Sequence, residues 1–177
     1  WPVSTGSSII TGVSGIDLDD DGIQEIALGT SDGRVWLLDY GGNPVQGWPL
    51  DLGSQLLWQP TQLSLAGRGG RGLVCALNNS VLTVVGRDGG PLPGWPVTLP
   101  FPAGTAPVTG DVNGDGQADL AFVTQNRRLN LFNSQGRQIP GWPLYLDERP
   151  VRGAAAAGRA RAGQSGLHVA VATIDGL

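Results

Sequence analysis

The 177-residue sequence contains no methionine and no lysine, and it has one cysteine and one histidine. The lone cysteine, Cys75, excludes an internal disulfide and does not indicate a redox compartment. Charged residues make up 15% of the chain and apolar residues 40%, which excludes the composition of a disordered chain. Because the formal net charge is −4, we expect no nucleic-acid partner, since nucleic-acid binding requires a concentrated basic surface.

Long apolar runs are also missing. No stretch reaches the roughly 18 apolar residues that a membrane-spanning helix needs, so this segment is not expected to cross a membrane. The chain begins at Trp1 rather than at a methionine. We therefore expect a processed chain or a piece of a larger one, with any signal peptide outside this segment.

Glycine and proline, by contrast, are abundant, and one motif that contains both recurs at a fixed period. Gly-Trp-Pro occurs at 47–49, 94–96 and 141–143, and the chain opens with Trp1-Pro2. Its tryptophans are 48 − 1, 95 − 48 and 142 − 95 residues apart, which is 47 each time. This period predicts one domain over 1–177, built from units 1–47, 48–94, 95–141 and a partial unit 142–177.

Each unit has the pattern of short strands joined by Gly, Asn, Asp and Pro turns. Equivalent apolar pairs mark one strand of the first three units: Val35 and Leu37, Leu82 and Val84, Leu129 and Leu131. Consecutive apolar residues, as in Leu120–Val123, favour sheets that are covered on both faces. The run Ala154–Ala157, flanked by glycines, is expected to lie in the first strand of unit four.

Units of this length with about four strands are typical of all-β proteins of the β-propeller class, whose blades stack around an axis. A β-solenoid or a β-sandwich is the alternative. Unit four stops before its second apolar strand, and an unfinished blade would expose sheet edges. We therefore expect the segment to be part of a larger propeller or to be completed by another segment.

Two equivalent loops are strongly acidic, at 17–25 and 111–119, and share the pattern D-x-[DN]-x-D-G-x-x-[DE]. Acids at alternate positions of a tightly curled loop present several oxygens to a hard cation such as Ca²⁺, and glycine at the sixth position permits the sharp turn. The alternative is that these residues simply form solvated turns. Crowding of like charges favours a counter-ion, so we predict two Ca²⁺ sites.

The predicted ligands occupy the first, third, fifth, seventh and ninth positions of each loop, the seventh through its carbonyl oxygen. They are Asp17, Asp19, Asp21, Ile23 and Glu25 in the first loop, and Asp111, Asn113, Asp115, Gln117 and Asp119 in the second. An EF-hand would place a glutamate at the twelfth position, where this chain has Leu28 or Phe122. Strand, acidic loop, strand is therefore the expected setting.

The equivalent loops of units two and four contain no carboxylate and are expected to bind no cation. Arginines stand there instead: Arg68, Arg71, Arg159 and Arg161. They are expected to be solvated, the alternative being that they meet neighbouring carboxylates or a partner.

The stretch from Gly110 to Leu120 resembles the calcium loop of FG-GAP or VCBS repeats, which build the integrin α-subunit type of propeller. Residues 15–29, with Ser31–Trp36 and the Gly-Trp-Pro segment, are similar to bacterial secreted members. The resemblance implies a propeller, calcium in the loops between strands, and an extracellular, cell-surface or periplasmic location.

Candidate catalytic groups are scarce. His168 aligns with Ala27, Val74 and Ala121 and is expected to be packed or at a rim. Cys75 aligns with Leu28 and Phe122 and is expected to be a core residue. No Ser-His-Asp set, phosphate loop or zinc spacing is present.

We therefore expect a non-enzymatic, calcium-stabilised module for cell adhesion, protein interaction or assembly, with a protein partner. The alternative is a carbohydrate-binding or polysaccharide-active propeller with a glycan ligand. The tryptophans of the repeated motif are expected to pack between blades, while Trp36 and Trp58 are the better candidates for a binding face.

Overall fold

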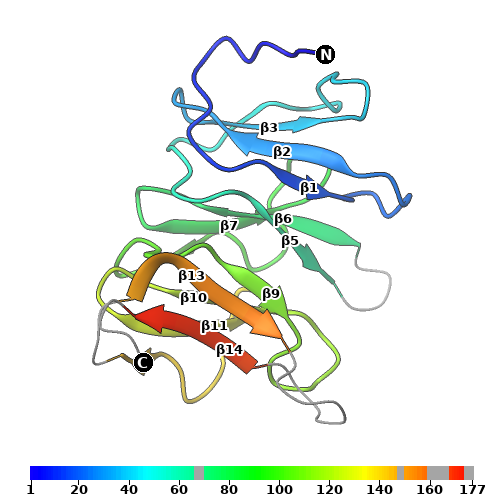
Figure 1. Ribbon diagram of the computed structural model, residues 1–177. Coiled ribbons are helices and arrows are strands. Elements are labelled where there is room, and N and C mark those ends of the chain that lie inside the picture. The colour runs from blue at the N-terminus through cyan, green and yellow to red at the C-terminus, as the bar shows by residue number, and fades with distance from the viewer. Residues whose placement is uncertain (66–69, 147–149, 159–167, 174–177) are drawn as a thin grey trace.

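A computed structural model describes residues 1–65, 70–146, 150–158 and 168–173, the last two ranges by their backbone alone. Within these ranges the chain is all β, as the sequence predicts, and no helix occurs. The described residues accordingly include no helix with the length and hydropathy to cross a bilayer. Figure 1 shows the sheets stacked one upon another along the molecule.

Three of the sheets have four antiparallel strands each, in the order of the sequence. The first contains β1 (Ser14–Ile16), β2 (Glu25–Gly29), β3 (Arg34–Leu38) and β4 (Leu50–Asp51). The second contains β5 (Thr61–Ser64), β6 (Arg71–Ala76), β7 (Val81–Val85) and β8 (Val97–Thr98). The third contains β9 (Val108–Gly110), β10 (Asp119–Val123), β11 (Arg128–Asn133) and β12 (Leu144–Tyr145).

Strand register repeats with the sequence period. Ser14 pairs with Ala27, Thr61 with Val74, and Val108 with Ala121, so that equivalent pairs lie 47 residues apart (61 − 14 and 108 − 61). The fourth strand of each sheet follows the Trp-Pro pair. A sequence unit counted from its tryptophan therefore begins beside the last strand of one sheet and supplies the first three strands of the next.

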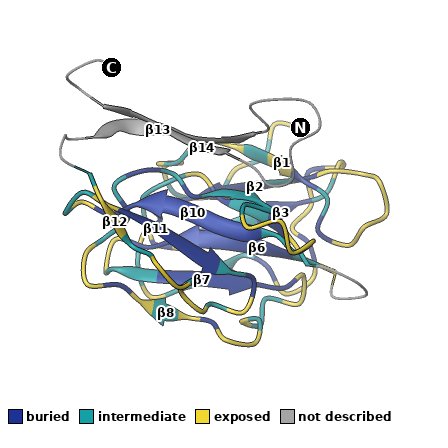
Figure 2. Cartoon of the chain, turned by 90° about the horizontal axis from the view of Figure 1, so that it is seen from below, coloured by how far each residue is buried: buried dark blue, intermediate teal, exposed yellow. Residues whose placement is uncertain are grey.

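The core lies between the sheets. Along β6, Leu73 and Cys75 pack in one cluster with the first sheet, while Val74 and Ala76 pack in another with the third. The second sheet is therefore buried on both faces, as its apolar runs predict. The Phe122 and Phe132 rings stack at 5.8 Å between centroids in the second cluster. Figure 2 shows the buried strands β6, β7 and β10 in the interior.

The first strands of successive sheets lie side by side, β1 next to β5, β5 next to β9, and β9 next to β13 (Pro150–Gly158). Thr109 Oγ1 in β9 donates a hydrogen bond of 2.8 Å to the Gln62 carbonyl in β5. The short fourth strands lie at the opposite end of each sheet. First strands that converge in this way are the arrangement of propeller blades.

The repeated tryptophan connects each sheet to the next. Trp48 Nε1 donates a hydrogen bond of 2.8 Å to the Arg87 carbonyl of the second sheet. Trp95 Nε1 donates one of 3.0 Å to the Ser134 carbonyl of the third sheet. Both rings are 6% exposed. Trp1 makes the equivalent bond to the Tyr40 carbonyl at 3.1 Å but is 65% exposed. The expected packing of this tryptophan between successive units is thus confirmed for Trp48 and Trp95, which lie between neighbouring sheets.

Glycine is required beside this tryptophan. Gly47, Gly94 and Gly141 all have φ near +90°, at 90°, 89° and 88°. A side chain at Gly94 would also meet the Gln135 main chain of the next sheet. The motif therefore combines a left-handed backbone, a close approach of two sheets and a ring that fills the space between them.

A fourth, two-stranded sheet pairs β13 with β14 (His168–Thr173). It places Ala154–Ala157 in β13, confirming that this run is a strand rather than a helix. Gly158 pairs with His168, whereas the 47-residue period would place Ala155 there, and a register irregularity lies between Pro150 and Ala155. The last sheet therefore departs from the register of the other three.

Candidate functional site

The two acidic loops join the first and second strands of the first and third sheets, so the predicted strand, loop, strand setting is confirmed. Residues 17–24 run from β1 to β2, and residues 111–118 from β9 to β10. The sixth-position glycines, Gly22 and Gly116, have φ of 85° and 83°, as the sharp turn requires.

Both loops are folded by the same hydrogen bonds. The first aspartate accepts from the main-chain amide of the sixth-position glycine, 3.1 Å for Asp17 and Gly22 and 3.0 Å for Asp111 and Gly116. The fifth-position aspartate accepts a hydrogen bond from the main-chain amide of the seventh residue. Its length is 2.7 Å in the first loop (17–25) and 2.8 Å in the loop of the third sheet (111–119), which we call the third-sheet loop. These bonds curl each loop around the side chain of its first aspartate.

The ninth residue closes each loop from the start of the second strand. Glu25 Oε2 accepts from the Leu18 amide at 2.9 Å. Asp119 Oδ2 accepts from the Val112 and Asn113 amides at 3.0 and 3.1 Å. Asp119 is fully buried, and its other oxygen, Oδ1, has no hydrogen-bond partner. A buried unpaired carboxylate oxygen is costly, which makes this atom a candidate ligand for a bound cation.

Burial raises the pKa of Asp119, and Asp115 and Asp111 raise it further by repulsion, against the two amide bonds that lower it. Burial likewise raises the pKa of Glu25, with Asp19 adding to the effect. The ninth position thus holds an acid in a setting that disfavours its charge. A bound cation would reverse that preference.

The first loop also brings three of its predicted ligands together. One carboxylate oxygen each from Asp17, Asp19 and Asp21 lies within 4.8 Å of the others. Among the described residues, the three acids of the third-sheet loop, Asp111, Asp115 and Asp119, do not form such a group. In that loop Asn113 Nδ2 donates a hydrogen bond of 3.0 Å to Asp115 Oδ2. The roles of the Ile23 and Gln117 carbonyl oxygens stay predictions.

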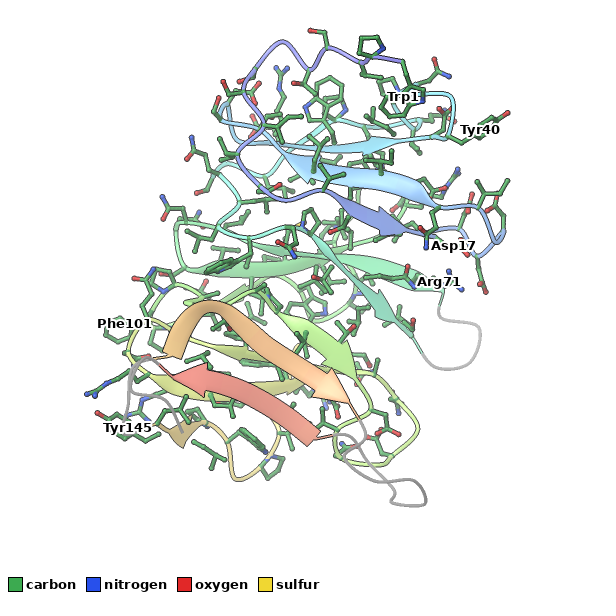
Figure 3. The ribbon with its side chains drawn as sticks, viewed as in Figure 1. Trp1, Asp17, Tyr40, Arg71, Phe101 and Tyr145 are labelled. Atoms are coloured by element: carbon green, nitrogen blue, oxygen red, sulfur yellow. The ribbon has the colours of Figure 1, made fainter. Side chains whose placement is uncertain are left out.

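Two arginines of the second sheet reach the first loop. Arg71 Nη1 lies 2.6 Å from Asp17 Oδ2 and donates 2.7 Å to the Asp17 carbonyl, and its Nη2 pairs with Asp20. Arg87 Nη2 lies 2.9 Å from Asp19 Oδ2. Figure 3 shows Asp17 and Arg71 on the same side of the molecule. The expectation of solvation is therefore wrong for Arg71, because the stacked sheets place it against carboxylates.

These contacts make the two loops electrostatically different. Burial opposes the charge of Asp17, but hydrogen bonds from Arg71 and Gly22 and the Arg71 charge outweigh it, so its pKa is lowered. The described residues give the third-sheet loop no equivalent arginine pair. Arg68, Arg159 and Arg161 lie outside the described residues.

Replacing Arg71 with alanine is expected to destabilise the chelator-treated protein at neutral pH, because Asp17, Asp20 and a carbonyl lose their donor. A lowered carboxyl pKa stabilises the fold above the unfolded-state pKa, and that contribution is lost as pH falls through the folded-state value. The difference from wild type should therefore fade below about pH 4. Urea unfolding at pH 7 and pH 3 measures it, and an equal difference at both pH values would contradict the ion-pair account.

The remaining candidates are placed by packing. Trp58 Nε1 donates 3.1 Å to the Ala103 carbonyl of the third sheet, and its ring packs on the second core cluster. Trp58 therefore packs against the next sheet while it stays partly exposed, and its place on a binding face stays a prediction. Trp36 is half-buried, and its Nε1 has no partner among the described residues. The side chain of His168 lies outside them.

Cys75 is fully buried, and burial raises the pKa of its thiol to about 12. Its packing in the first core cluster confirms it as a core residue, as its alignment with Leu28 and Phe122 predicts. A neutral, inaccessible thiol of this kind is a poor nucleophile.

Comparison with known proteins relates this geometry to a repeat family. Residues 103–127, which include the third-sheet loop, match the FG-GAP repeat. No curated protein sequence matches the chain. BBS1N in complex with ARL6DN is a similar solved structure, with a TM-score of 0.72, 14% identity, and coverage of 98% of this chain and 50% of that one.

Two further solved structures are similar in fold. BamB from Moraxella catarrhalis gives a TM-score of 0.59 and 17% identity over 84% of this chain and 42% of that one. The V. cholerae biofilm matrix protein Bap1 gives 0.51 and 13% over 97% and 37%. The chain thus spans half the length of these structures or less. Residues 103–127 thus match the FG-GAP repeat, within a chain whose three four-stranded antiparallel sheets resemble those of β-propeller-like structures.

Proposed function

We propose that this chain is a calcium-stabilised, β-propeller-type module that serves protein interaction or assembly. The observation that carries the calcium part is the unpaired Oδ1 of the buried Asp119. A hard cation bound in the loop would neutralise this oxygen together with the neighbouring acids.

The third-sheet loop is the stronger of the two proposed sites. Its ligand set would be Asp111, Asn113, Asp115, Asp119 and the Gln117 carbonyl. Each of these residues would contribute an oxygen atom, the ligand that Ca²⁺ prefers. The first loop offers the equivalent set, but Arg71 and Arg87 already supply positive charge there. We therefore expect calcium to bind the third-sheet loop more tightly.

Calcium would be structural in this role. The third-sheet loop joins β9 to β10, so an ion held there would fix the first two strands of the sheet relative to each other. If the loops bind calcium with moderate affinity, millimolar extracellular calcium would fill them, so we propose an extracellular, cell-surface or periplasmic location.

Support for a protein-interaction role comes from fold likeness. The solved BBS1N structure is a complex with ARL6DN, and Bap1 is described as a biofilm matrix protein. One fold can serve many functions, so the proposal is restricted to protein interaction or assembly in general. A non-catalytic role is proposed because the sequence has no recognisable Ser-His-Asp set, phosphate loop or zinc spacing.

Calorimetric titration of the chelator-treated protein with calcium chloride tests the metal site directly. Wild type should bind calcium, and Asp119→Asn should lose the tightest site while retaining hydrogen bonds from the Val112 and Asn113 amides. Asp88→Asn, an exposed turn aspartate outside both loops, is the matched control and should bind as wild type does. Unchanged tight binding by Asp119→Asn would refute the assignment.

A further inference from the structure

Successive sheets leave a groove between the fourth strand of one and the third strand of the next, and two of these grooves occupy equivalent register. One lies between the first and second sheets and has a volume of about 200 Å³. The other, between the second and third sheets, has a volume of about 550 Å³, within the range of small-ligand sites. We call this larger groove the β8–β11 groove.

The two grooves differ in chemistry at positions 47 residues apart. In the smaller groove, Leu77, Val81, Thr83, Val85 and Pro91 line the wall. The β8–β11 groove has Thr124, Arg128, Asn130, Phe132 and Gln138 at those positions. Polar residues thus stand in the larger groove where the smaller one has apolar residues: Thr124 for Leu77, Arg128 for Val81 and Gln138 for Pro91. Asn130 stands in place of Thr83. These polar side chains are not needed to form a groove between two sheets, because the smaller groove forms without them.

Hydrogen bonds preorganise the polar wall. Asn130, which is buried, donates through Nδ2 to the Arg128 carbonyl at 2.7 Å and to Thr124 Oγ1 at 3.3 Å. Its Oδ1 accepts from Gln138 Nε2 at 3.2 Å. Gln138 is exposed, and its amide oxygen can accept while its second N–H can donate. Arg128 is also exposed and supplies further donors.

The opposite wall is apolar. Val97, Leu99, Pro100 and Phe101 contribute to it, and the Phe101 ring is 46% exposed. Figure 3 shows Phe101 and Tyr145 on the same side of the molecule, and the Arg128 guanidinium lies 6.0 Å from the Tyr145 ring centre. An amphipathic ligand with one apolar face and one hydrogen-bonding edge matches these two walls.

We infer that the β8–β11 groove binds a saccharide. The hydroxyl groups of a sugar both donate and accept, which suits the Gln138 amide and the Arg128 guanidinium, while a C–H face of the ring packs on Phe101. Among the described side chains that line the groove none is a carboxylate, which disfavours a cationic ligand. This site is distinct from both acidic loops and does not depend on calcium.

Register-matched substitutions provide the test. Arg128→Val with Gln138→Pro gives the β8–β11 groove the residues of the smaller groove, Val81 and Pro91. The backbone should tolerate the change, because Phe132 bridges to Gln138 as Val85 bridges to Pro91. Arg34→Val is the control, since Arg34 holds the position of Arg128 in the first sheet and is exposed.

The purified chain would be applied to an array of neutral and uronic-acid oligosaccharides, and hits titrated with and without chelator. We expect wild type and Arg34→Val to bind alike, and the double variant and Phe101→Ala each to bind about tenfold more weakly or worse. Unfolding curves check that every variant is folded. No oligosaccharide bound by wild type, or equal binding by the folded double variant and wild type, would overturn the inference.

Discussion

Replacing Trp95 with alanine is expected to lower the free energy of unfolding by about 3–5 kcal/mol, the usual cost of deleting a large buried aromatic side chain. Its ring is 6% exposed in the second core cluster, and its Nε1 bonds to the Ser134 carbonyl of the next sheet. The substitution removes apolar packing and leaves that carbonyl without its donor. Chemical unfolding of both proteins measures the difference.

Trp1→Ala is the control for this prediction. Trp1 makes the same kind of bond, to the Tyr40 carbonyl, but its ring is 65% exposed. If burial between sheets is what stabilises the fold, Trp1→Ala should cost only a small fraction of the Trp95→Ala effect. Equal losses would show that the hydrogen bond, rather than the buried ring, is the main contribution.

Removal of calcium is expected to produce the second large effect. If a loop binds with a Kd of roughly 10–100 µM, 1 mM calcium stabilises the fold by about 1.4–2.7 kcal/mol per site. For a chain of this size that corresponds to a shift in Tm of roughly 3–11 °C. Thermal unfolding with 1 mM calcium and then with excess chelator measures the shift.

The two loops should contribute unequally to this shift. Asp119→Asn should remove most of it, because the buried carboxylate of the third-sheet loop has an oxygen without a partner. Asp21→Asn should remove less, because Arg71 and Arg87 already balance the charge of the first loop. An identical Tm in calcium and in chelator would contradict structural calcium binding in this chain.

Much of the fold could be predicted from the sequence, because the repeat makes each local signal appear several times. The apolar pairs Val35 and Leu37, Leu82 and Val84 lie in strands and are buried. The glycines of the acidic loops have the positive φ that the ligand pattern requires. Apolar alternation and turn chemistry act within a few residues, and the 47-residue period repeats them, so a single sequence is enough to recognise them.

The contacts between sheets could not be predicted in the same way. Arg71 looked like a solvated residue of a degenerate loop, yet it meets Asp17, 54 residues away. Trp58 lies outside the repeated tryptophan register, yet its Nε1 bonds to the Ala103 carbonyl of the third sheet. The register of β13 with β14 likewise departs from the period. Such pairings depend on how neighbouring sheets stack, which local patterns do not encode.

The outermost strands β4, β8 and β12 are only two residues long. Each therefore presents very few unpaired main-chain groups to a strand of another molecule. A strand of another molecule that paired with one of these three rims would therefore form only a few main-chain hydrogen bonds, which gives edge-to-edge association little to gain there.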